Sequence, residues 1–393
     1  MCLSGGGFRA TLFGLGVLRY LAEVGQLKNV VAVSAVSGGS VAAAILADRW
    51  PDLARDALGG DAFQQHVADP FCAAISEHNL RNRGLARWTA TRVVPRTHRA
   101  PGAMGATIAA HLLRSKRVAD LPVGVQVILT ATDLVSGRAF RISREFIGSW
   151  DFGYAATPPT LTLATAIAAS TAVPFLFPPV HLATDNLGLR PNTPHKLALV
   201  DGGVYDNLGL EWFQGWDRGR PDAARAADFI ITVDASSPLR PKPKRYGWVT
   251  SLKRSQEAQY AQTRASRVRW FVDQLLAGNL RGIHVPIDRD PRTFLPPPGL
   301  AALAGAAEAA LPSELVPLIS GLRTDLDRFL PEESQLIMYH GYWATHVRLT
   351  HLHPALATAT PSWRDYADLS AAHTHRVLHL LQSGRERQLN RRR

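Results

Sequence analysis

Short apolar runs recur along the chain and predict the strands of a buried sheet. Residues 30–36 (VVAVSAV) show the pattern most clearly, because nearly every position is apolar and several are β-branched. The predicted strands cover residues 1–3, 30–36, 125–130, 197–200 and 229–233. Helix-forming stretches separate these runs, so we expect an α/β fold, a three-layer sandwich with a mostly parallel central sheet and helical insertions.

Helices are predicted where residues of high helix propensity, many of them apolar, continue over longer stretches. The predicted helices cover residues 11–23, 40–47 and 250–277, and residues 311–352 are expected to form two helices separated at Pro331. In that last region, Tyr339, Tyr342 and Trp343 are expected to pack on the sheet.

The domain organisation follows from length and composition. A chain of 393 residues with 46% hydrophobic residues can bury one large core, and we expect a single domain over residues 1–384. Residues 50–121 are long, basic and helix-prone, with Trp88, Arg92, Arg96 and Arg99 close together, and we expect a helical insertion or cap there. It is either a lipid-facing lid or a set of surface helices anchored in the core. The basic tail at 385–393 is expected to be disordered, and the short first strand is expected to begin before Met1.

A serine on a sharp turn between strand and helix is the first candidate for chemistry. Ser37 ends the strand at 30–36, and Gly38 and Gly39 lead into the helical stretch at 40–47. This order is typical of a nucleophile elbow, in which small neighbours expose the hydroxyl and the helix start supplies N–H groups. The alternative is that Ser37 only caps the helix, a role that serine often takes.

Consecutive glycines at residues 5–7 form the second candidate. Glycines let the backbone approach closely and aim N–H groups at an anion, which in acyl transfer is the tetrahedral oxyanion. The spacing Gly5-x-Gly7-x-x-Ala10 also fits a dinucleotide fingerprint. That fingerprint requires an acidic residue at the end of the next strand, where this chain has Ser37. The dinucleotide interpretation is therefore disfavoured.

Asp201 is the third candidate, and it could act as a base. It ends the predicted strand at 197–200, and Gly202 and Gly203 turn the chain after it. An aspartate at such a place is most often a turn residue. Burial beside apolar groups would raise its pKa and allow it to accept the Ser37 proton. Since ligands bind at the carboxyl ends of parallel strands, all three segments are expected to meet in one cleft.

Together these segments resemble the patatin-like phospholipase family, which includes the cytosolic phospholipase A2 catalytic domain. Residues 4–10 (SGGGFRA) resemble its oxyanion loop, Ser37 stands at its nucleophile position, and residues 201–203 (DGG) resemble its Asp-Gly-Gly/Ala motif. Residues 131–137 and 169–180 resemble two further blocks of the family. Ala35 replaces the first glycine of the family's elbow pattern, a departure that an elbow could tolerate.

The resemblance implies a lipid acyl hydrolase, a phospholipase A-like esterase that acts on a phospholipid or another lipid ester. It implies a dyad in which Asp201 activates Ser37 directly, through an acyl-enzyme and without a histidine. It also implies that Arg9 holds a substrate phosphate. The implied oxyanion-hole residues are Gly5, Gly6, Gly7 and Gly38, and the remaining motif glycines are Gly39, Gly202 and Gly203. Regiospecificity, and whether water or an alcohol accepts the acyl group, stay open.

Two other functions remain open at this point. An α/β-hydrolase esterase or thioesterase would add a histidine after the acid in the chain, and His284 and His340 are the candidates. Each of them is more commonly a structural or surface histidine. A membrane-associated scaffold without activity is the other alternative, although nucleophile, base and glycine loop are all present.

The charge indicates a possible partner surface. The formal net charge is +12, and only 6 of the 44 basic residues are lysine. Arginine binds phosphate with two parallel hydrogen bonds, so an anionic membrane surface is one interpretation, and an arginine-rich genome is the other. The proline-rich basic stretch at 240–248, which carries Tyr246 and Trp248, is a candidate for interfacial binding or an exposed linker. Nucleic acid is not expected, because no reading motif accompanies the charge.

The sequence gives no reason to expect a cofactor. We find no zinc, P-loop or calcium-loop motif, so neither a metal nor an organic cofactor is expected. Cys2 and Cys72 are far apart and suggest no disulfide. No signal peptide and no apolar run of about 18 residues is visible. We therefore expect a cytoplasmic protein or one that binds membranes peripherally.

Overall fold

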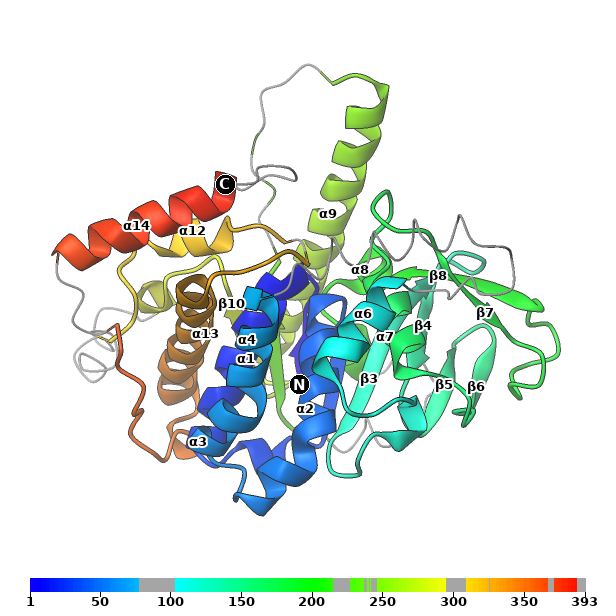
Figure 1. The fold of residues 1–393 in the computed structure, drawn as a ribbon, viewed down its shortest axis with the longest axis horizontal. Helices are drawn as coiled ribbons and strands as arrows, with labels where there is room; N and C mark the ends of the chain where they lie inside the picture. Colours follow the sequence, from blue (N-terminus) through cyan, green and yellow to red (C-terminus); the bar gives the residue numbers. More distant parts are fainter. Residues whose placement is uncertain are drawn as a thin grey trace.

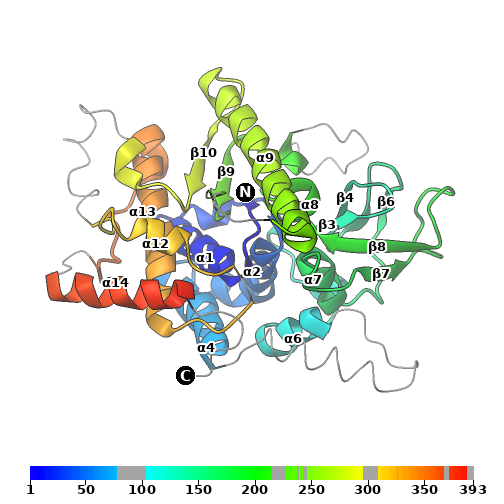
Figure 2. The same cartoon turned by 90° about the horizontal axis from the view of Figure 1, so that it is seen from above.

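A ten-stranded mixed sheet runs through the molecule, with helices on both of its faces (Figure 1). The computed structural model describes residues 1–77, 103–214, 227–236, 239, 241, 246–294, 309–324, 326–366 and 371–386. Seen from above, α9 (Trp248–Leu276) runs diagonally across the molecule, with α12 (Val316–Ser320), α13 (Pro331–Leu352) and α14 (Ala371–Glu386) on one side of it and the antiparallel strands on the other (Figure 2).

The parallel half of the sheet has the strand order β10-β9-β1-β2-β3. These strands are β1 (Cys2–Leu3), β2 (Ala32–Val36), β3 (Gln126–Asp133), β9 (Ile230–Asp234) and β10 (Gly282–Pro286). Four of the five were predicted from the sequence, with shifted ends. The predicted α/β fold with a central sheet is confirmed. Strand β1 has only two residues and lies in the middle of the parallel half.

The second half of the sheet is an antiparallel arm, of which only the strand at residues 197–200 was predicted from the sequence. Strands β4 (Ala139–Ile142), β5 (Phe146–Ser149) and β6 (Gly153–Ala156) follow β3 in order, and β7 (Val180–Ala183) pairs with β8 (Lys196–Asp201). All except β8 have only four residues. Turns close them, helped by positive φ at Gly137 and Gly153, so no run was long enough to stand out.

Strand β8 corrects one assumption behind the predicted cleft. It runs antiparallel to β3, so Asp201 does not lie at the end of a parallel strand. Asp201 nevertheless pairs with Ala131, and the preceding β3 residue, Thr130, pairs with Val36 at the end of β2. The register therefore brings Asp201 next to Ser37, although the two strands point in opposite directions.

Two sets of helices cover the sheet. Helices α1 (Gly7–Glu23), α2 (Gly38–Arg55) and α13 (Pro331–Leu352) lie on one face, where Leu3 joins the main core, and α9 (Trp248–Leu276) lies on the other, where Cys2 contacts a smaller core that includes Phe271. The other helices are α3 (Gly60–Phe63), α4 (Asp69–Glu77), α6 (Ala103–Leu112), α7 (Leu163–Thr171), α8 (Gly203–Asp206), α12 (Val316–Ser320) and α14 (Ala371–Glu386). One π turn (Gln64–Ala68) and 3-10 turns at Leu27–Asn29, Val118–Asp120, Glu211–Phe213, Pro291–Phe294 and Pro354–Leu356 connect them.

The α1–α13 contact is a close helix packing made possible by glycine. A side chain at Gly16 would collide with the Met338 carbonyl, and one at Gly341 would collide with the Phe13 carbonyl. Pro331 is the first residue of α13, as its missing N–H allows. In residues 311–330, where a helix was predicted, the part of the chain that the structure describes is mostly irregular and contains the short α12.

The aromatic residues of α13, which we expected to pack on the sheet, make ring contacts with α1 and with the C-terminal segment. Tyr342 packs edge-on against Tyr20 of α1 at 5.3 Å, and Tyr339 packs edge-on against Trp363 at 5.3 Å. Trp343 donates its ring N–H to the Trp363 carbonyl at 3.1 Å. These residues fix the C-terminal segment onto the helical layer.

The predicted cap and tail are described only in part. In residues 50–77, Phe63, Phe71 and Ile75 are buried in the main core, and α6 packs on α7. Trp88, Arg92, Arg96 and Arg99 lie outside the described residues. Helix α14 continues through residue 386, so the first two residues of the predicted tail are helical, and residues 387–393 are not described. Among the helices that the structure describes, none is long and apolar enough to cross a membrane.

Candidate active site

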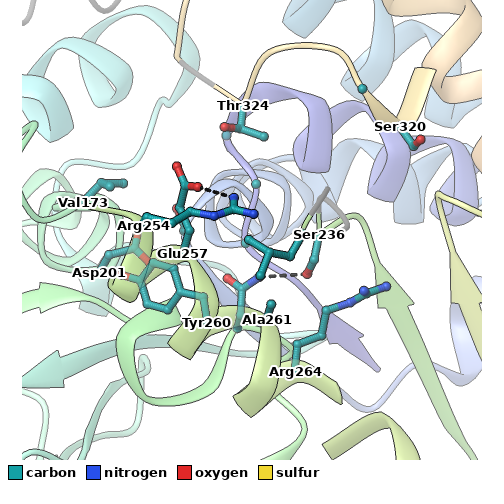
Figure 3. Close-up of a pocket in the computed structure, with 17 residues that line it drawn as sticks. Val173, Asp201, Ser236, Arg254, Glu257, Tyr260, Ala261, Arg264, Ser320 and Thr324 are labelled. Carbon is teal, nitrogen blue, oxygen red and sulfur yellow. Dashed lines mark hydrogen bonds and ion pairs between the residues drawn. The ribbon is translucent and has the colours of Figure 1, made fainter. Parts of the chain in front are cut away.

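A cavity of about 450 Å³ lies at the ends of β1, β2 and β8 (Figure 3). The glycine loop, the candidate nucleophile and the candidate base all line it, together with residues from α9 and from the chain after α12. The lining residues are Gly5, Gly6, Gly7, Ser37, Val173, Asp201, Asn207, Ser236, Leu239, Arg254, Glu257, Tyr260, Ala261, Arg264, Ser320, Gly321 and Thr324.

Ser37 occupies a strained turn between β2 and α2. Its backbone has φ 51° and ψ −119°, a region that non-glycine residues rarely adopt and that costs about 1–3 kcal/mol. The two following glycines make the turn possible, because a side chain at Gly38 would collide with the Gly7 carbonyl and one at Gly39 with the Leu3 carbonyl. Strain of this kind at a strand–helix turn is characteristic of a nucleophile elbow.

Ser170 on α7 holds this turn in place. Its hydroxyl donates to the Thr130 carbonyl at 2.7 Å and accepts the Ser37 backbone N–H at 3.1 Å. Ser40 in the first turn of α2 lies 2.8 Å from the same oxygen. One hydroxyl thus joins β3, the elbow and α2. Ser170 belongs to the block at residues 169–180, and the sequence alone suggested no role for it.

Ser170→Ala is expected to lower kcat about 10- to 100-fold with little change in KM, because the buried Ser37 N–H loses its acceptor and the elbow is held less firmly. Steady-state kinetics on a soluble ester would measure both parameters. Thr171→Ala is the matched control, since the Thr171 hydroxyl donates to Ile167 in its own helix. Equal losses of kcat in both variants would argue against a positioning role for Ser170.

Asp201 has the properties of a base. Its side chain is buried, and one carboxylate oxygen accepts the Gly203 N–H at 2.8 Å. Burial raises the pKa of Asp201 to about 6, while the Ser37 hydroxyl and then the Gly203 N–H stabilise the ionised form. The other carboxylate oxygen, Oδ2, is buried without a hydrogen-bond partner among the described residues, and Ser37 and Asp201 line the same cavity. A carboxylate with a pKa near 6 is a better base than one in water, yet it is still ionised at neutral pH.

A second buried carboxylate nearby is unsuited to this role. Asp234, at the end of β9, contacts Arg264 at 2.6 Å and His284 at 3.3 Å. Burial alone would raise its pKa, but the hydrogen bond with His284 and the charge of Arg264 hold the pKa of Asp234 below its usual range. A carboxylate stabilised in this way is a weak proton acceptor. The environment of Asp201 therefore suits a base, whereas that of Asp234 suits a structural anion.

The glycine loop lies directly beside Ser37. An ideal Cβ at Gly5 would lie 3.3 Å from the Ser37 Cβ. Gly6 has φ 138° and precedes α1, and Gly7 has φ 58° and begins it. As the first residues of α1 and α2, Gly7 and Gly38 carry N–H groups that have no acceptor inside their own helices.

The structure does not support the predicted role of Gly5 as an oxyanion donor. Its N–H donates to the Asn207 carbonyl at 2.9 Å, so it is already engaged. The Asn207 side chain in turn donates to the Ser236 hydroxyl at 2.8 Å. A side chain at Gly5 would collide with the Asn207 amide oxygen, so this glycine provides close packing. Asn207 was missed by the sequence analysis, because no motif that we recognised includes it.

Arg9 also differs from its predicted role. Its side chain is fully buried and does not line the cavity. The guanidinium donates to the carbonyls of Ser320 at 2.6 Å, Leu322 at 2.9 Å and Ala235 at 2.7 Å. Arg9 therefore ties α1 to two segments of the cavity wall. A phosphate could reach it only if these bonds were broken, so the structure favours a structural role.

The candidate histidines of a triad lie elsewhere. His284 contacts Asp234, and His340 on α13 lies 2.9 Å from the Ile287 carbonyl. Burial lowers the pKa of His340 to about 4. No histidine is among the described residues that line the cavity. The Ser-His-Asp alternative therefore lacks, among the described residues of the cavity, a histidine that could act on Ser37.

Helix α9 supplies one wall of the cavity, which the sequence analysis did not foresee. Arg254, Glu257, Tyr260 and Arg264 follow each other at the three- and four-residue spacing of one helix face, and Ala261 lies four residues after Glu257 on the same face. Burial, and then the charge of Asp201, raise the pKa of Tyr260. Figure 3 shows Tyr260 next to Asp201 in the cavity, so this wall lies near the base. Within the described residues, no cluster of side chains suited to a metal ion is found.

Comparison with solved structures finds human GIVD cytosolic phospholipase A2 at 15% identity and a TM-score of 0.48, covering 91% of this chain and 62% of that chain. The same human enzyme in complex with methyl gamma-linolenyl fluorophosphonate matches at 14% identity and a TM-score of 0.47, covering 91% and 59%. The chain spans about three fifths of the length of these structures. No curated protein matches the sequence.

Comparison with family models is more informative. The model described as patatin-like phospholipase matches residues 1–212, which is more than half of the 393 residues. The matched region contains the glycine loop, Ser37 and Asp201. The chain therefore belongs to the patatin-like phospholipase family.

Proposed function

We propose that this protein is a lipid acyl hydrolase in which Ser37 is the nucleophile and Asp201 its base. The observation that carries the proposal is the meeting of a strained serine turn and a buried carboxylate of raised pKa in one cavity. Family membership supports a lipid ester as the substrate. The cavity of about 450 Å³ is large enough for part of a lipid molecule.

In the proposed mechanism, Asp201 accepts the Ser37 hydroxyl proton as the oxygen attacks the ester carbonyl carbon. The carbonyl oxygen becomes an oxyanion, and the N–H groups of Gly6, Gly7 and Gly38 stabilise it, each contributing about 3 kcal/mol. The intermediate then collapses, and Asp201 returns the proton to the departing alcohol. In the second half, Asp201 accepts a proton from water as the water oxygen attacks the acyl-enzyme; the bond to Ser37 then breaks, the fatty acid is released, and Asp201 returns the proton to the Ser37 oxygen.

Membrane contact is part of this proposal, because the substrate would come from a lipid surface. Trp248 is 75% exposed and Leu252 is 49% exposed at the end of α9 that projects from the body (Figure 1). Leu239, which lines the cavity, is also exposed. Exposed aromatic and apolar side chains near a cavity mouth suit insertion between lipid headgroups. Of the predicted interfacial stretch, only residues 241 and 246–248 are described.

A fluorophosphonate probe tests the nucleophile in the unmodified protein. We expect stoichiometric labelling of Ser37, located by peptide mass spectrometry, because the probe forms a stable adduct with an activated serine hydroxyl. Ser236 and Ser320 line the same cavity and serve as internal controls that should stay unlabelled. Folded protein without label on Ser37 would contradict the proposal and favour the scaffold alternative.

A further inference from the structure

The second half of the proposed mechanism needs a water molecule held between Ser37 and Asp201. That water gives one hydrogen to Asp201 as its oxygen attacks the acyl carbon. Its second hydrogen stays on the oxygen, and an acceptor for this hydrogen would hold the water in the attacking orientation. An alcohol has a single O–H group, so it would gain nothing from that second acceptor. A site with two acceptors therefore favours water over an alcohol.

The side-chain amide oxygen of Asn207 lies beside both reacting residues. An ideal Cβ at Gly5 would lie 2.2 Å from this oxygen and 3.3 Å from the Ser37 Cβ. An ideal Cβ at Gly203 would lie 2.6 Å from the same oxygen and 2.9 Å from Asp201 Oδ1. Because both positions are glycine, the Asn207 oxygen can lie close to the nucleophile and to the base.

Asn207 is fixed at two points. Its backbone carbonyl accepts the Gly5 N–H at 2.9 Å. Its side-chain N–H donates to the Ser236 hydroxyl at 2.8 Å, which is the hydrogen bond drawn at Ser236 in Figure 3. The nitrogen is thus directed to Ser236, and the oxygen, an acceptor with two lone pairs, remains on the opposite side of the amide. Within the part of the chain that the structure describes, no group donates a hydrogen bond to this oxygen, and Asn207 lines the cavity.

We propose that Asn207 positions the hydrolytic water and thereby favours water over alcohols as the acyl acceptor. The inference rests on the proposed function and extends it to the second substrate. The water oxygen bonds to the acyl carbon, one hydrogen passes to Asp201, and the other, still on that oxygen, donates to the Asn207 amide oxygen. The bond between the acyl carbon and the Ser37 oxygen then breaks, Asp201 returns its proton to the serine, and the fatty acid keeps the remaining hydrogen.

Product partitioning from p-nitrophenyl butyrate in water–methanol mixtures tests this role. Methanolysis of the acyl-enzyme gives methyl butyrate, and hydrolysis gives butyric acid. We expect Asn207→Ala to raise the ratio of methyl butyrate to butyric acid about 5- to 10-fold, because only the attack of water loses a hydrogen bond. The ratio depends on the partition of the acyl-enzyme alone, so it is valid whichever step limits the overall rate.

Burst kinetics without methanol provide a second measurement. The first turnover releases p-nitrophenol as the acyl-enzyme forms, and the later steady state reports its hydrolysis. We expect Asn207→Ala to lower the steady-state rate by the same factor of about 5 to 10 and to affect the burst rate less. A purely structural role would lower both rates together.

Two further variants serve as comparisons. Ser236→Ala removes the group that orients the amide and should raise the product ratio about two- to threefold, so it decides the proposal even if Asn207→Ala does not fold. Asn279→Ala is the matched control, because Asn279 is an exposed asparagine outside the cavity lining whose side chain donates to Gln274. Its product ratio should equal that of the unmodified protein.

The two levels of the proposal fail in different ways. Labelling of Ser37 by the probe, together with a product ratio that neither Asn207→Ala nor Ser236→Ala changes, would overturn the role of Asn207 and leave the proposed catalysis standing. Absence of both probe labelling and a burst in the unmodified protein would contradict the catalysis, and the role of Asn207 with it.

Discussion

Ser37→Ala is expected to reduce fatty-acid release from a mixed lipid panel to background, with a fall in kcat of about 10⁴- to 10⁶-fold. The alanine keeps the turn and the cavity but has no oxygen to attack the carbonyl. Released fatty acids, quantified by mass spectrometry, provide the measurement. Activity that survives in folded Ser37→Ala would show that another group is the nucleophile.

Ser37→Gly should be equally inactive but more stable than Ser37→Ala. Glycine adopts φ 51° without the cost that a side chain imposes, so we expect a gain of about 1 kcal/mol in the free energy of unfolding. Chemical denaturation of the two variants measures the difference. Equal stability would mean that the surroundings relax around the alanine.

Asp201→Asn is expected to lower kcat/KM by about 10²- to 10⁴-fold, because the amide cannot accept the Ser37 proton. With a pKa of Asp201 near 6, the kcat/KM of the unmodified enzyme should rise with pH and level off above about pH 7. A pH–rate profile on an uncharged soluble ester measures this. A profile without inflection between pH 5 and 7 would contradict the assignment of the base.

The same substitution should stabilise the protein. The folded state binds the Asp201 proton more tightly than the unfolded chain does. The stability that this proton adds to the folded state is therefore fully present below about pH 4 and is lost as the pH rises through about 6. Asparagine stays neutral. We therefore expect Asp201→Asn to exceed the unmodified protein by about 3 kcal/mol in free energy of unfolding at pH 8, and by less at pH 5. Urea denaturation at the two pH values would reveal the trend, and a constant difference would contradict it.

The parallel core and the main site segments were predictable because each carries a strong local signal. A β-branched run followed by Ser37 and two glycines determines a strand, a turn and a helix within a few residues. The glycines at 5–7 and 202–203 likewise mark places where backbones approach closely. Such signals depend on nearby residues, so they survive without knowledge of the rest of the fold.

Features that depend on distant contacts could not be predicted. The four-residue strands of the antiparallel arm are stabilised by their neighbours in the sheet, not by their composition. The role of Arg9 depends on carbonyls more than 200 residues away in the chain. The Gly5 N–H is engaged by Asn207, which no local pattern reveals. Helix α9 was predicted, but nothing in its sequence indicated that one face would line the cavity.

Helix α9 lies outside the part of the chain that holds the reacting groups. The residues proposed for bond cleavage all fall within 1–212, whereas the cavity wall formed by α9 lies beyond it. Exchanging this single helix would therefore change the cavity wall while the reacting groups are left untouched.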